Sequence, residues 1–206
     1  MKQKSRFAMI AVAMLAISCG IPALRAEVQK AANNQERAPS EEELERKLHS
    51  TGTELAQRIP KPRPEDVVSP KAIVTAIHEA ISGPPGPFNW DRFRSLFLPD
   101  GMIGEAGGKP GEEKVMYLRV SEWIDAVRKA RETATVHEVV QKVKVEQFGS
   151  IANVFYTHTL GEGTEESERR IGTNLSQLVF DGKRWWVASM VWNGTPQADQ
   201  VPPEFK

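Results

Sequence analysis

The chain has 206 residues, of which 40% are hydrophobic and 26% are charged. This composition is that of one folded domain with extensions, and it excludes a wholly disordered chain, a collagen-like chain and a polytopic membrane protein. The formal net charge is zero, but the segment 1–26 holds four basic residues and no acid, so the remainder carries 23 basic against 27 acidic side chains. A mildly acidic body has no electrostatic attraction for nucleic acid or for anionic lipid.

The N-terminal segment 1–26 is predicted to be an export signal. Lys2, Lys4 and Arg6 precede an uncharged run of 12 residues from Phe7 to Ser18. A transmembrane helix needs about 20 apolar residues, so we expect no membrane span here. A positive start, a short apolar stretch and small residues after it are typical of a secretory signal peptide. The mature protein is therefore expected to be exported, either periplasmic or secreted.

Two kinds of cleavage are compatible with this signal. The only cysteine, Cys19, ends the apolar run in a stretch that resembles a bacterial lipobox, in which the cysteine is acylated and becomes the new N-terminus. Ala16 stands where that motif usually has leucine, and ordinary cleavage after Ala23 or Ala26 is the alternative. Cleavage before Cys19 would add a lipid anchor. In both cases the folded part has no cysteine and hence no disulfide.

Residues 27–68 are predicted to be a partly disordered tether. No aromatic residue occurs between Glu27 and Pro87, so the core must come from later parts of the chain. Ser40 followed by Glu43 is a capping-box pattern, which opens a helix expected within 41–58. The alternative to a free tether is that this helix packs on the surface of the domain.

Residues 69–195 are predicted to form the folded domain, followed by a tail at 196–206. Helical periodicity comes first, and a period of two takes over after it. The helical half is predicted as a helix from Ser69-Pro70 to Gly83, a helix at about 89–98, a loop at 104–113, a strand at 115–120 and a helix from Ser121 to about Lys129. Four strands are predicted to follow, at Thr135–Phe148, Ala152–Leu160, Arg170–Phe180 and Arg184–Trp192. This order predicts an α+β fold in which N-terminal helices pack on a curved antiparallel sheet.

Three stretches of this domain resemble the nuclear transport factor two-like, or SnoaL-like, superfamily. They run from Asn89 to Phe97, from Phe148 to Phe155 and, most specifically, from Ser176 to Val187. The resemblance covers 69–195 and is to a bacterial, exported branch. It implies a cone-shaped fold around a pocket. The superfamily includes isomerases, dehydratases and binding domains, so the fold does not choose the function, and no stretch matches a catalytic motif.

The candidate catalytic residues lie on two predicted strands and one predicted helix. Strict alternation puts His137 on one face with Val143, and it puts Tyr156 and His158 on one face of the next strand. These faces are expected to turn inward, whereas a bulge in the first strand would turn His137 toward water. Asp125, on the third helix, could reach the mouth of the pocket. The candidates for acid–base chemistry are therefore His137, Tyr156, His158 and Asp125.

The pocket is expected to be apolar and free of metal. His78, on the first helix, is interpreted as a partly buried structural histidine, and no set of ligand residues has a recognisable metal spacing, so neither a metal nor a cofactor is expected. The residues expected to line the pocket are Trp90, Phe93, Phe97, Tyr117, Trp123 and Asn174. Filling of the core is the alternative role for the aromatic members of this set.

A second surface is predicted on the outer face of the sheet. Trp185 and Trp186 are successive and must point to opposite sides of a strand. One of them, together with Trp192, is expected on the outer face, where an apolar row indicates a homodimer interface.

Three functions remain open at this point. The leading interpretation is an exported domain that binds a small apolar molecule and pairs through its sheet. The alternative is a pocket lyase, isomerase or hydrolase that uses histidine, tyrosine or aspartate, and it requires at least two of the four candidates to meet within hydrogen-bonding reach. The second alternative is a structural module for protein interaction, with the cone filled by its own side chains.

Overall fold

The computed structural model describes residues 39–109, 111–161, 170–193 and 201–205. The predicted signal segment, Cys19 and both predicted cleavage regions lie outside the described residues. The chain divides into two units, 1–48 and 49–206, which are described separately. No helix within the described ranges has the length and apolar character needed to cross a bilayer.

The described part of the first unit is helix α2, Glu41–Leu48. Its N-terminus carries the capping box that the sequence predicts. The Ser40 amide donates to the Glu43 carboxylate at 2.6 Å, and the Glu43 amide donates to Ser40 Oγ at 3.2 Å. No residue of α2 is buried, so local capping rather than packing defines this helix.

The second unit begins with short helical elements that lead into the domain. Helix α3, Gly52–Ala56, has its own capping box between Thr51 and Glu54, so the helix expected within 41–58 is present as two shorter ones. A 3-10 turn, η1, follows at Pro64–Val67.

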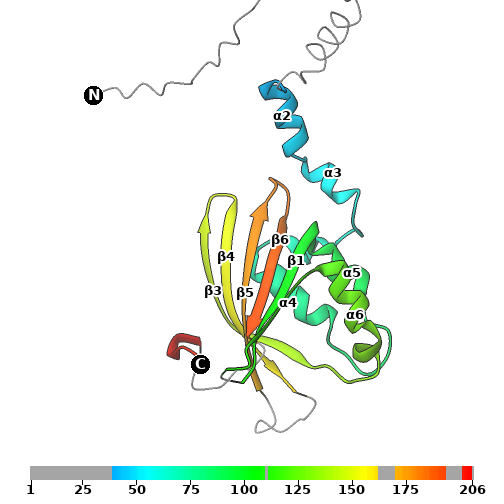
Figure 1. Ribbon diagram of the computed structural model, residues 1–206, viewed down its shortest axis with the longest axis vertical. Coiled ribbons are helices and arrows are strands. Elements are labelled where there is room, and N and C mark those ends of the chain that lie inside the picture. Colours follow the sequence, from blue (N-terminus) through cyan, green and yellow to red (C-terminus); the bar gives the residue numbers. More distant parts are fainter. Residues whose placement is uncertain (1–38, 110, 162–169, 194–200, 206) are drawn as a thin grey trace, which may run out of the picture. The chain divides into compact units, whose positions relative to one another are not determined.

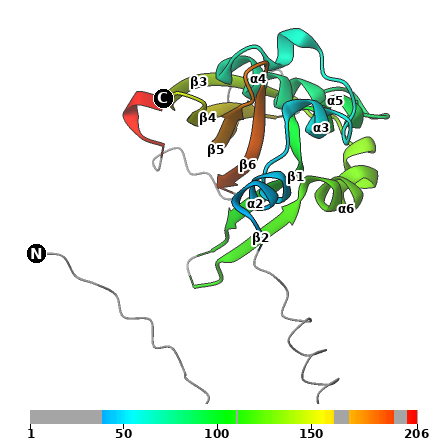
Figure 2. The same ribbon diagram turned by 90° about the horizontal axis from the view of Figure 1, so that it is seen from above.

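Helices α4, Pro70–Ala80, α5, Trp90–Ser95, and α6, Val120–Glu132, lie along one side of a sheet (Figures 1 and 2). The start of α4 follows the predicted signal, because Ser69 Oγ accepts a hydrogen bond from the Ala72 amide at 3.1 Å and a proline occupies the first turn. The apolar stripe of α4 is fully buried, and His78 is buried with it.

Six strands form one curved sheet in the order β2-β1-β6-β5-β4-β3. The strands are β1 Phe97–Gly107, β2 Lys114–Arg119, β3 Glu138–Phe148, β4 Ile151–Leu160, β5 Arg170–Phe180 and β6 Trp185–Asn193. Helices on one face of such a sheet confirm the predicted α+β class. The prediction of a purely antiparallel sheet is wrong, because β1 pairs with β6 in parallel.

Strand β1 is the element that sequence reading misses. Residues 104–113 are not all loop, since Gly104 to Gly107 belong to β1 and pair with β2. The ring of Tyr117 and Cγ1 of Val191 lie close over Gly104. A Cβ atom at this position would approach the Tyr117 ring to 2.8 Å, so the close packing favours glycine. The glycine is thus a packing requirement in a strand, and not the sign of a loop. The second helix also ends earlier than predicted, at Ser95, because Phe97 already begins β1.

A bulge in β3 reverses which side chains face the helices. The register with β4 shifts between Val140 and Val143. Before the bulge Glu138 is buried and His137 is exposed, whereas after it the odd-numbered Val143 packs against the core. Strict alternation from His137 to Val143 is therefore wrong, and His137 faces outward.

The tryptophans of β6 do not form an outer row. Trp185 and Trp186 are both buried, at 5% and 0% exposure, and Trp192 packs against the core cluster. Trp186 Nε1 donates to Asp181 at 2.8 Å, and the Arg184 guanidinium stacks 3.9 Å from the Trp186 ring. Trp185 and Val187 both belong to the core cluster, so Trp186 between them points to the opposite side of the sheet, where it is buried. The predicted outer placement therefore holds for one tryptophan of the pair and is wrong for Trp192.

The outer face instead carries a row of other apolar residues across five strands. Phe155 pairs directly with Leu175, and Leu175 pairs directly with Val191. Val191 in turn pairs with Gly104, and the ring of Tyr117 lies over this glycine. Phe155, Val191 and Tyr117 remain 38%, 36% and 54% exposed. We call Phe155, Leu175, Val191 and Tyr117 the outer row.

Near β3 and β4 the C-terminal segment lies on the domain, as Figure 1 shows in red. Thr157 Oγ1 donates to the Phe205 carbonyl at 3.3 Å, and Val201 is buried.

Candidate functional site

A cavity of about 600 Å³ lies between the helices and the inner face of the sheet. One wall is apolar and includes Phe93 of α5, Trp123 of α6 and Met190 of β6. The Phe93 and Trp123 rings stack at 5.5 Å, which fixes this wall. The other end is polar, with side chains from α4, α6 and three neighbouring strands. We call His78, Glu138, Tyr156, His158 and Asn174 the polar cluster.

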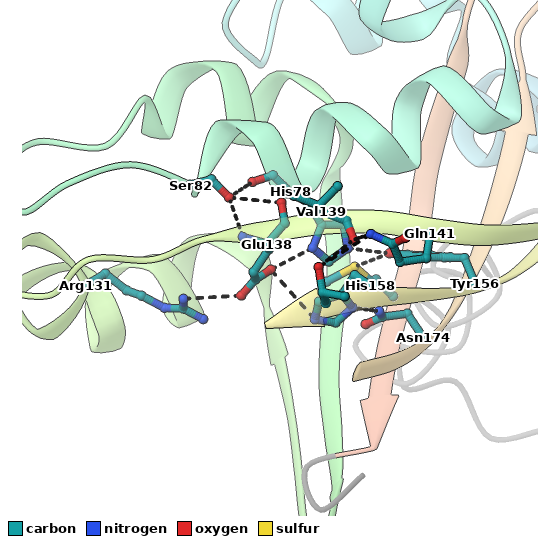
Figure 3. Close-up of polar contacts among 11 residues, drawn as sticks. His78, Ser82, Arg131, Glu138, Val139, Gln141, Tyr156, His158 and Asn174 are labelled. Carbon is teal, nitrogen blue, oxygen red and sulfur yellow. Dashed lines mark hydrogen bonds and ion pairs between the residues drawn. The ribbon is translucent and has the colours of Figure 1, made fainter. Parts of the chain in front are cut away.

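The polar cluster is organised around Glu138, the first residue of β3 (Figure 3). Glu138 Oε2 lies 2.6 Å from His78 Nδ1, and Oε1 lies 3.5 Å from Arg131 Nη1 of α6. The Ser82 hydroxyl links the backbone of β3 to the backbone of α4. It accepts a hydrogen bond from the Glu138 amide at 3.0 Å and donates one to the His78 carbonyl at 2.8 Å. Glu138 is thus held from three directions while it still lines the cavity.

His158 stands beside this pair, on β4. Its Nε2 lies 4.0 Å from Glu138 Oε2, and its ring lies 4.4 Å from the His78 ring. Its Nδ1 contacts Asn174 Nδ2 at 2.7 Å. Gly172 of β5 is the direct cross-strand partner of His158, and a Cβ at this glycine would overlap the imidazole. The absence of a side chain at Gly172 therefore makes the space for His158.

Tyr156 contacts the ring nitrogen of His78 that Glu138 does not contact. Its hydroxyl lies 3.3 Å from His78 Nε2 and donates to Met190 Sδ at 3.3 Å. Tyr156 is only 1% exposed, so it supports His78 rather than facing the cavity.

Burial and neighbouring charges set the protonation states of the cluster. Burial raises the pKa of Glu138, but the hydrogen bond from His78 and the nearby positive charges outweigh it, so the pKa lies below its ordinary value. Burial, with the charge of His78, lowers the pKa of His158 to about 4. Burial also raises the pKa of Tyr156 above its ordinary value. At neutral pH the cavity therefore presents a carboxylate and a neutral His158 imidazole, and the buried Tyr156 phenol behind His78 stays protonated.

This arrangement can bind a polar group at one end of an apolar cavity. The carboxylate can accept a hydrogen bond or a proton, and a neutral imidazole can donate or accept one. The same residues include a ligand set for a metal ion, since atoms of His78, Glu138 and His158 lie within 4.8 Å of one another.

The structure brings some predicted site residues together and separates others. Tyr156 and His158 belong to the polar cluster, and Phe93, Trp123 and Asn174 line the cavity. His137 lies at the mouth of the cavity with an exposed side chain.

The remaining predicted residues lie elsewhere. Asp125 is exposed, because it sits on the face of α6 opposite Trp123 and Ile124. Trp90 and Phe97 are buried in the core outside the cavity lining, and Tyr117 lies on the outer row because the pairing of β2 with β1 turns it outward. Trp90 and Phe97 thus take the alternative role, filling of the core, and neither Tyr117 nor Asp125 is among the residues that line the cavity.

Sequence reasoning missed Glu138 and undervalued His78. Glu138 was hidden by the bulge, which no local signal of the strand reveals. His78 did give a signal, since a histidine stood on the apolar stripe formed by Ile73, Val74, Ile77 and Ile81. A titratable group on a buried stripe requires a partner inside the core.

Comparison with known proteins concerns the fold. The chain matches no family model and no curated protein. Solved structures that it is similar to include an NTF2-like protein of unknown function from Pseudomonas putida, with 14% identity, 53% of this chain and 79% of that chain covered, and a TM-score of 0.40. An uncharacterized protein with a cystatin-like fold from Caulobacter vibrioides has 14% identity, coverages of 63% and 88%, and a TM-score of 0.46. The association domain of C. elegans CaMKII has 12% identity, coverages of 58% and 88%, and a TM-score of 0.41.

A protein named NTF2-like is thus among the structures that this chain is similar to, as the sequence resemblance predicts. At these identities and scores the likeness carries no conclusion about function.

Proposed function

We propose that this protein binds a small, largely apolar molecule that carries one polar group. The observation that carries the proposal is the polar cluster at one end of a cavity whose other wall is Phe93, Trp123 and Met190. Ligand sites in proteins are typically concave and mostly apolar, with a few polar groups that fix orientation. The volume of about 600 Å³ also falls within the usual range of such sites, roughly 300–1,000 Å³. A cavity of this volume disfavours the structural module, in which the protein's own side chains would fill the interior.

The binding proposal is tested with 2-naphthol, a molecule with a flat apolar body and one hydroxyl. Isothermal titration calorimetry should give saturable binding with one site per chain. Ala130→Trp, which places an indole in the lining on α6, should abolish binding. Ala126→Trp is the matched control, because Ala126 is an exposed alanine of the same helix outside the lining. Equal binding by both variants would contradict the assignment of the cavity.

Catalysis is the second candidate function, and one observation favours it. Glu138 is an oriented carboxylate at the cavity, held by His78 and Arg131, and such a group can take a proton from a bound substrate. The arrangement differs from the predicted one, because Tyr156 and His158 meet through His78 rather than directly.

A base at Glu138 is tested with 5-nitrobenzisoxazole, which opens to a coloured phenolate when a base removes its ring C–H proton and the N–O bond breaks. The protein should accelerate this opening, Glu138→Gln should remove the acceleration, and Asp125→Asn should keep it. Acceleration that survives in Glu138→Gln would exclude Glu138 as the base.

We propose that the interface of a homodimer is formed by the outer row and not by tryptophans. A continuous apolar row on the open face of the sheet supports a contact with a second copy of this chain. Static light scattering should give a dimer for the full chain and a monomer for Phe155→Glu. Val68→Glu, which changes another exposed apolar side chain away from the sheet, should remain dimeric. A monomer in the unchanged protein would exclude this proposal.

Export, with acylation of Cys19 or cleavage after Ala23 or Ala26, remains a proposal that rests on the sequence pattern. Metabolic labelling with a palmitate analogue in a bacterial host distinguishes the two routes. Lipidation predicts a label that Cys19→Ala removes, whereas ordinary cleavage predicts no label and a mature N-terminus at residue 24 or 27.

A further inference from the structure

Three atoms of types that bind transition metals converge at the polar end of the cavity. One ligand atom each from His78, Glu138 and His158 lies within 4.8 Å of the others. The atoms that approach one another are Nδ1 of His78, Oε2 of Glu138 and Nε2 of His158. The carboxylate oxygen takes part in both contacts, at 2.6 Å from His78 and 4.0 Å from His158. Figure 3 shows the three side chains pointing toward one another from separate elements.

The opposite polar atom of each of these side chains is already held by a neighbour. Nε2 of His78 contacts the Tyr156 hydroxyl at 3.3 Å, and Oε1 of Glu138 contacts Arg131 at 3.5 Å. Nδ1 of His158 contacts the Asn174 amide at 2.7 Å. Each side chain therefore presents one atom to the shared point and anchors the other. Outer partners of this kind orient the ligands of metal sites in proteins.

The backbone elements that carry the three residues are fixed independently. His78 lies on α4, Glu138 begins β3 and His158 lies within β4. The three residues are 3%, 8% and 7% exposed, and all of them line the cavity. Gly172 adds the space that the His158 ring occupies. The convergence thus follows from packed elements and does not depend on a loop.

We propose that His78, Glu138 and His158 bind one divalent transition-metal ion, such as zinc or iron(II). Two imidazoles and one carboxylate are a ligand set that these ions accept, and they leave coordination positions open for a further ligand. The cavity lies on the open side, so a polar group of the bound molecule completes the coordination. The inference deepens the proposed function, since it rests on the cavity admitting that molecule.

Binding of the ion requires defined positions for the imidazole protons. His78 must carry its proton on Nε2 and donate it to the Tyr156 oxygen, while Tyr156 continues to donate to Met190 Sδ. His158 must carry its proton on Nδ1. The Asn174 amide, with its oxygen and nitrogen exchanged by a half turn, then accepts a hydrogen bond from His158 Nδ1–H through Oδ1. Both histidines can therefore ligate as neutral imidazoles without losing their outer partners.

The test uses the full chain freed of metal by a chelator and titrated with cobalt(II) and with zinc. Cobalt(II) should produce a visible ligand-field absorption band that saturates at one ion per chain, and zinc should displace it. His158→Ala and Glu138→Gln should each weaken binding at least tenfold. The matched control is His49→Ala, which removes an exposed histidine outside the cavity lining and should leave the affinity unchanged.

A measurement on the unchanged protein guards against variants that fail to fold. Zinc should raise the midpoint of thermal unfolding in proportion to the logarithm of its concentration, and magnesium should not. Asn174→Ala should weaken zinc binding about tenfold, which is the usual effect of losing an outer partner.

Two results would overturn the inference. One is the absence of a saturable cobalt band in the unchanged protein, and the other is an affinity that His158→Ala and Glu138→Gln retain. If 2-naphthol still binds under those results, the metal site fails while the binding proposal stands. If cobalt binds with one ion per chain but 2-naphthol does not, the metal site stands and the proposed binding of an apolar molecule fails.

Discussion

The two ends of the cavity illustrate two different uses of buried side chains. The aromatic wall, with Phe93 and Trp123, removes apolar area from water and so stabilises the fold. The polar cluster buries a carboxylate and two imidazoles, whose desolvation offsets most of what their mutual contacts gain. A purely structural core would fill the same space with apolar residues. The comparison indicates that the wall stabilises the fold, whereas the polar cluster adds little net stability, as the proposed binding function expects.

The largest effect is expected at the wall. Trp123→Ala should lower the free energy of unfolding by about 3–5 kcal/mol, because it deletes a buried indole that stacks on Phe93. Urea unfolding measures the change. Asp125→Ala, an exposed position two residues along the same helix, should stay within about 0.5 kcal/mol of the unchanged protein. A decrease in unfolding free energy of less than about 1 kcal/mol for Trp123→Ala would show that the aromatic wall contributes little to stability.

Breaking the polar cluster from one side should have a somewhat smaller effect. Glu138→Leu leaves His78 buried without its closest partner and should cost about 3 kcal/mol of unfolding free energy. Glu138→Gln keeps the shape and one hydrogen-bond acceptor, so it should cost about half as much. Chemical denaturation of both variants checks the ranking, and equal costs would contradict a role for the charge.

A side chain at Gly172 would occupy the space of the His158 ring and so tests how closely the polar cluster is packed. Gly172→Ala should cost about 1–3 kcal/mol, because the new methyl group overlaps the imidazole and forces a shift. The double variant Gly172→Ala with His158→Ala has no ring to displace, so it should be more stable than the sum of the two single changes predicts. A double-mutant cycle in urea measures this coupling. A coupling energy of zero would contradict the close fit of Gly172 to His158.

The smallest effect is expected for the histidine outside the polar cluster. His137→Ala should change the unfolding free energy by less than about 0.5 kcal/mol, since this side chain is exposed and lies beyond the hydrogen bonds of Glu138. A loss near that of Glu138→Leu would mean that the cluster extends to the mouth of the cavity. Parallel thermal unfolding of the two variants gives the answer.

Local patterns suffice for much of this fold. The cap at Ser69, the stripe of α4 and the alternation of β4 each depend on neighbouring residues, and the alternation alone places Tyr156 and His158 on one buried face. The same logic fails in β3. A single inserted residue between Val140 and Val143 exchanges Glu138 for His137 on the inner face, and this shift is set by pairing with β4 rather than by local sequence.

Strand β1 and the parallel pairing with β6 also escape local reading. Gly104 and Gly107 indicate a loop when read alone, and only the Tyr117 ring over Gly104 explains the glycine in a strand. The partners of His78 are 60 and 78 positions away in the chain, so the candidate site becomes visible only once the fold is known.

The most direct test of the difference between the two ends is the unfolding free energy of the double variant His78→Phe with Glu138→Leu. It replaces the central pair of the polar cluster with apolar side chains of similar size. If the pair serves binding rather than stability, the double variant should be at least as stable as the unchanged protein, and zinc should no longer stabilise it. A double variant that loses as much stability as the two single changes added together would contradict this account.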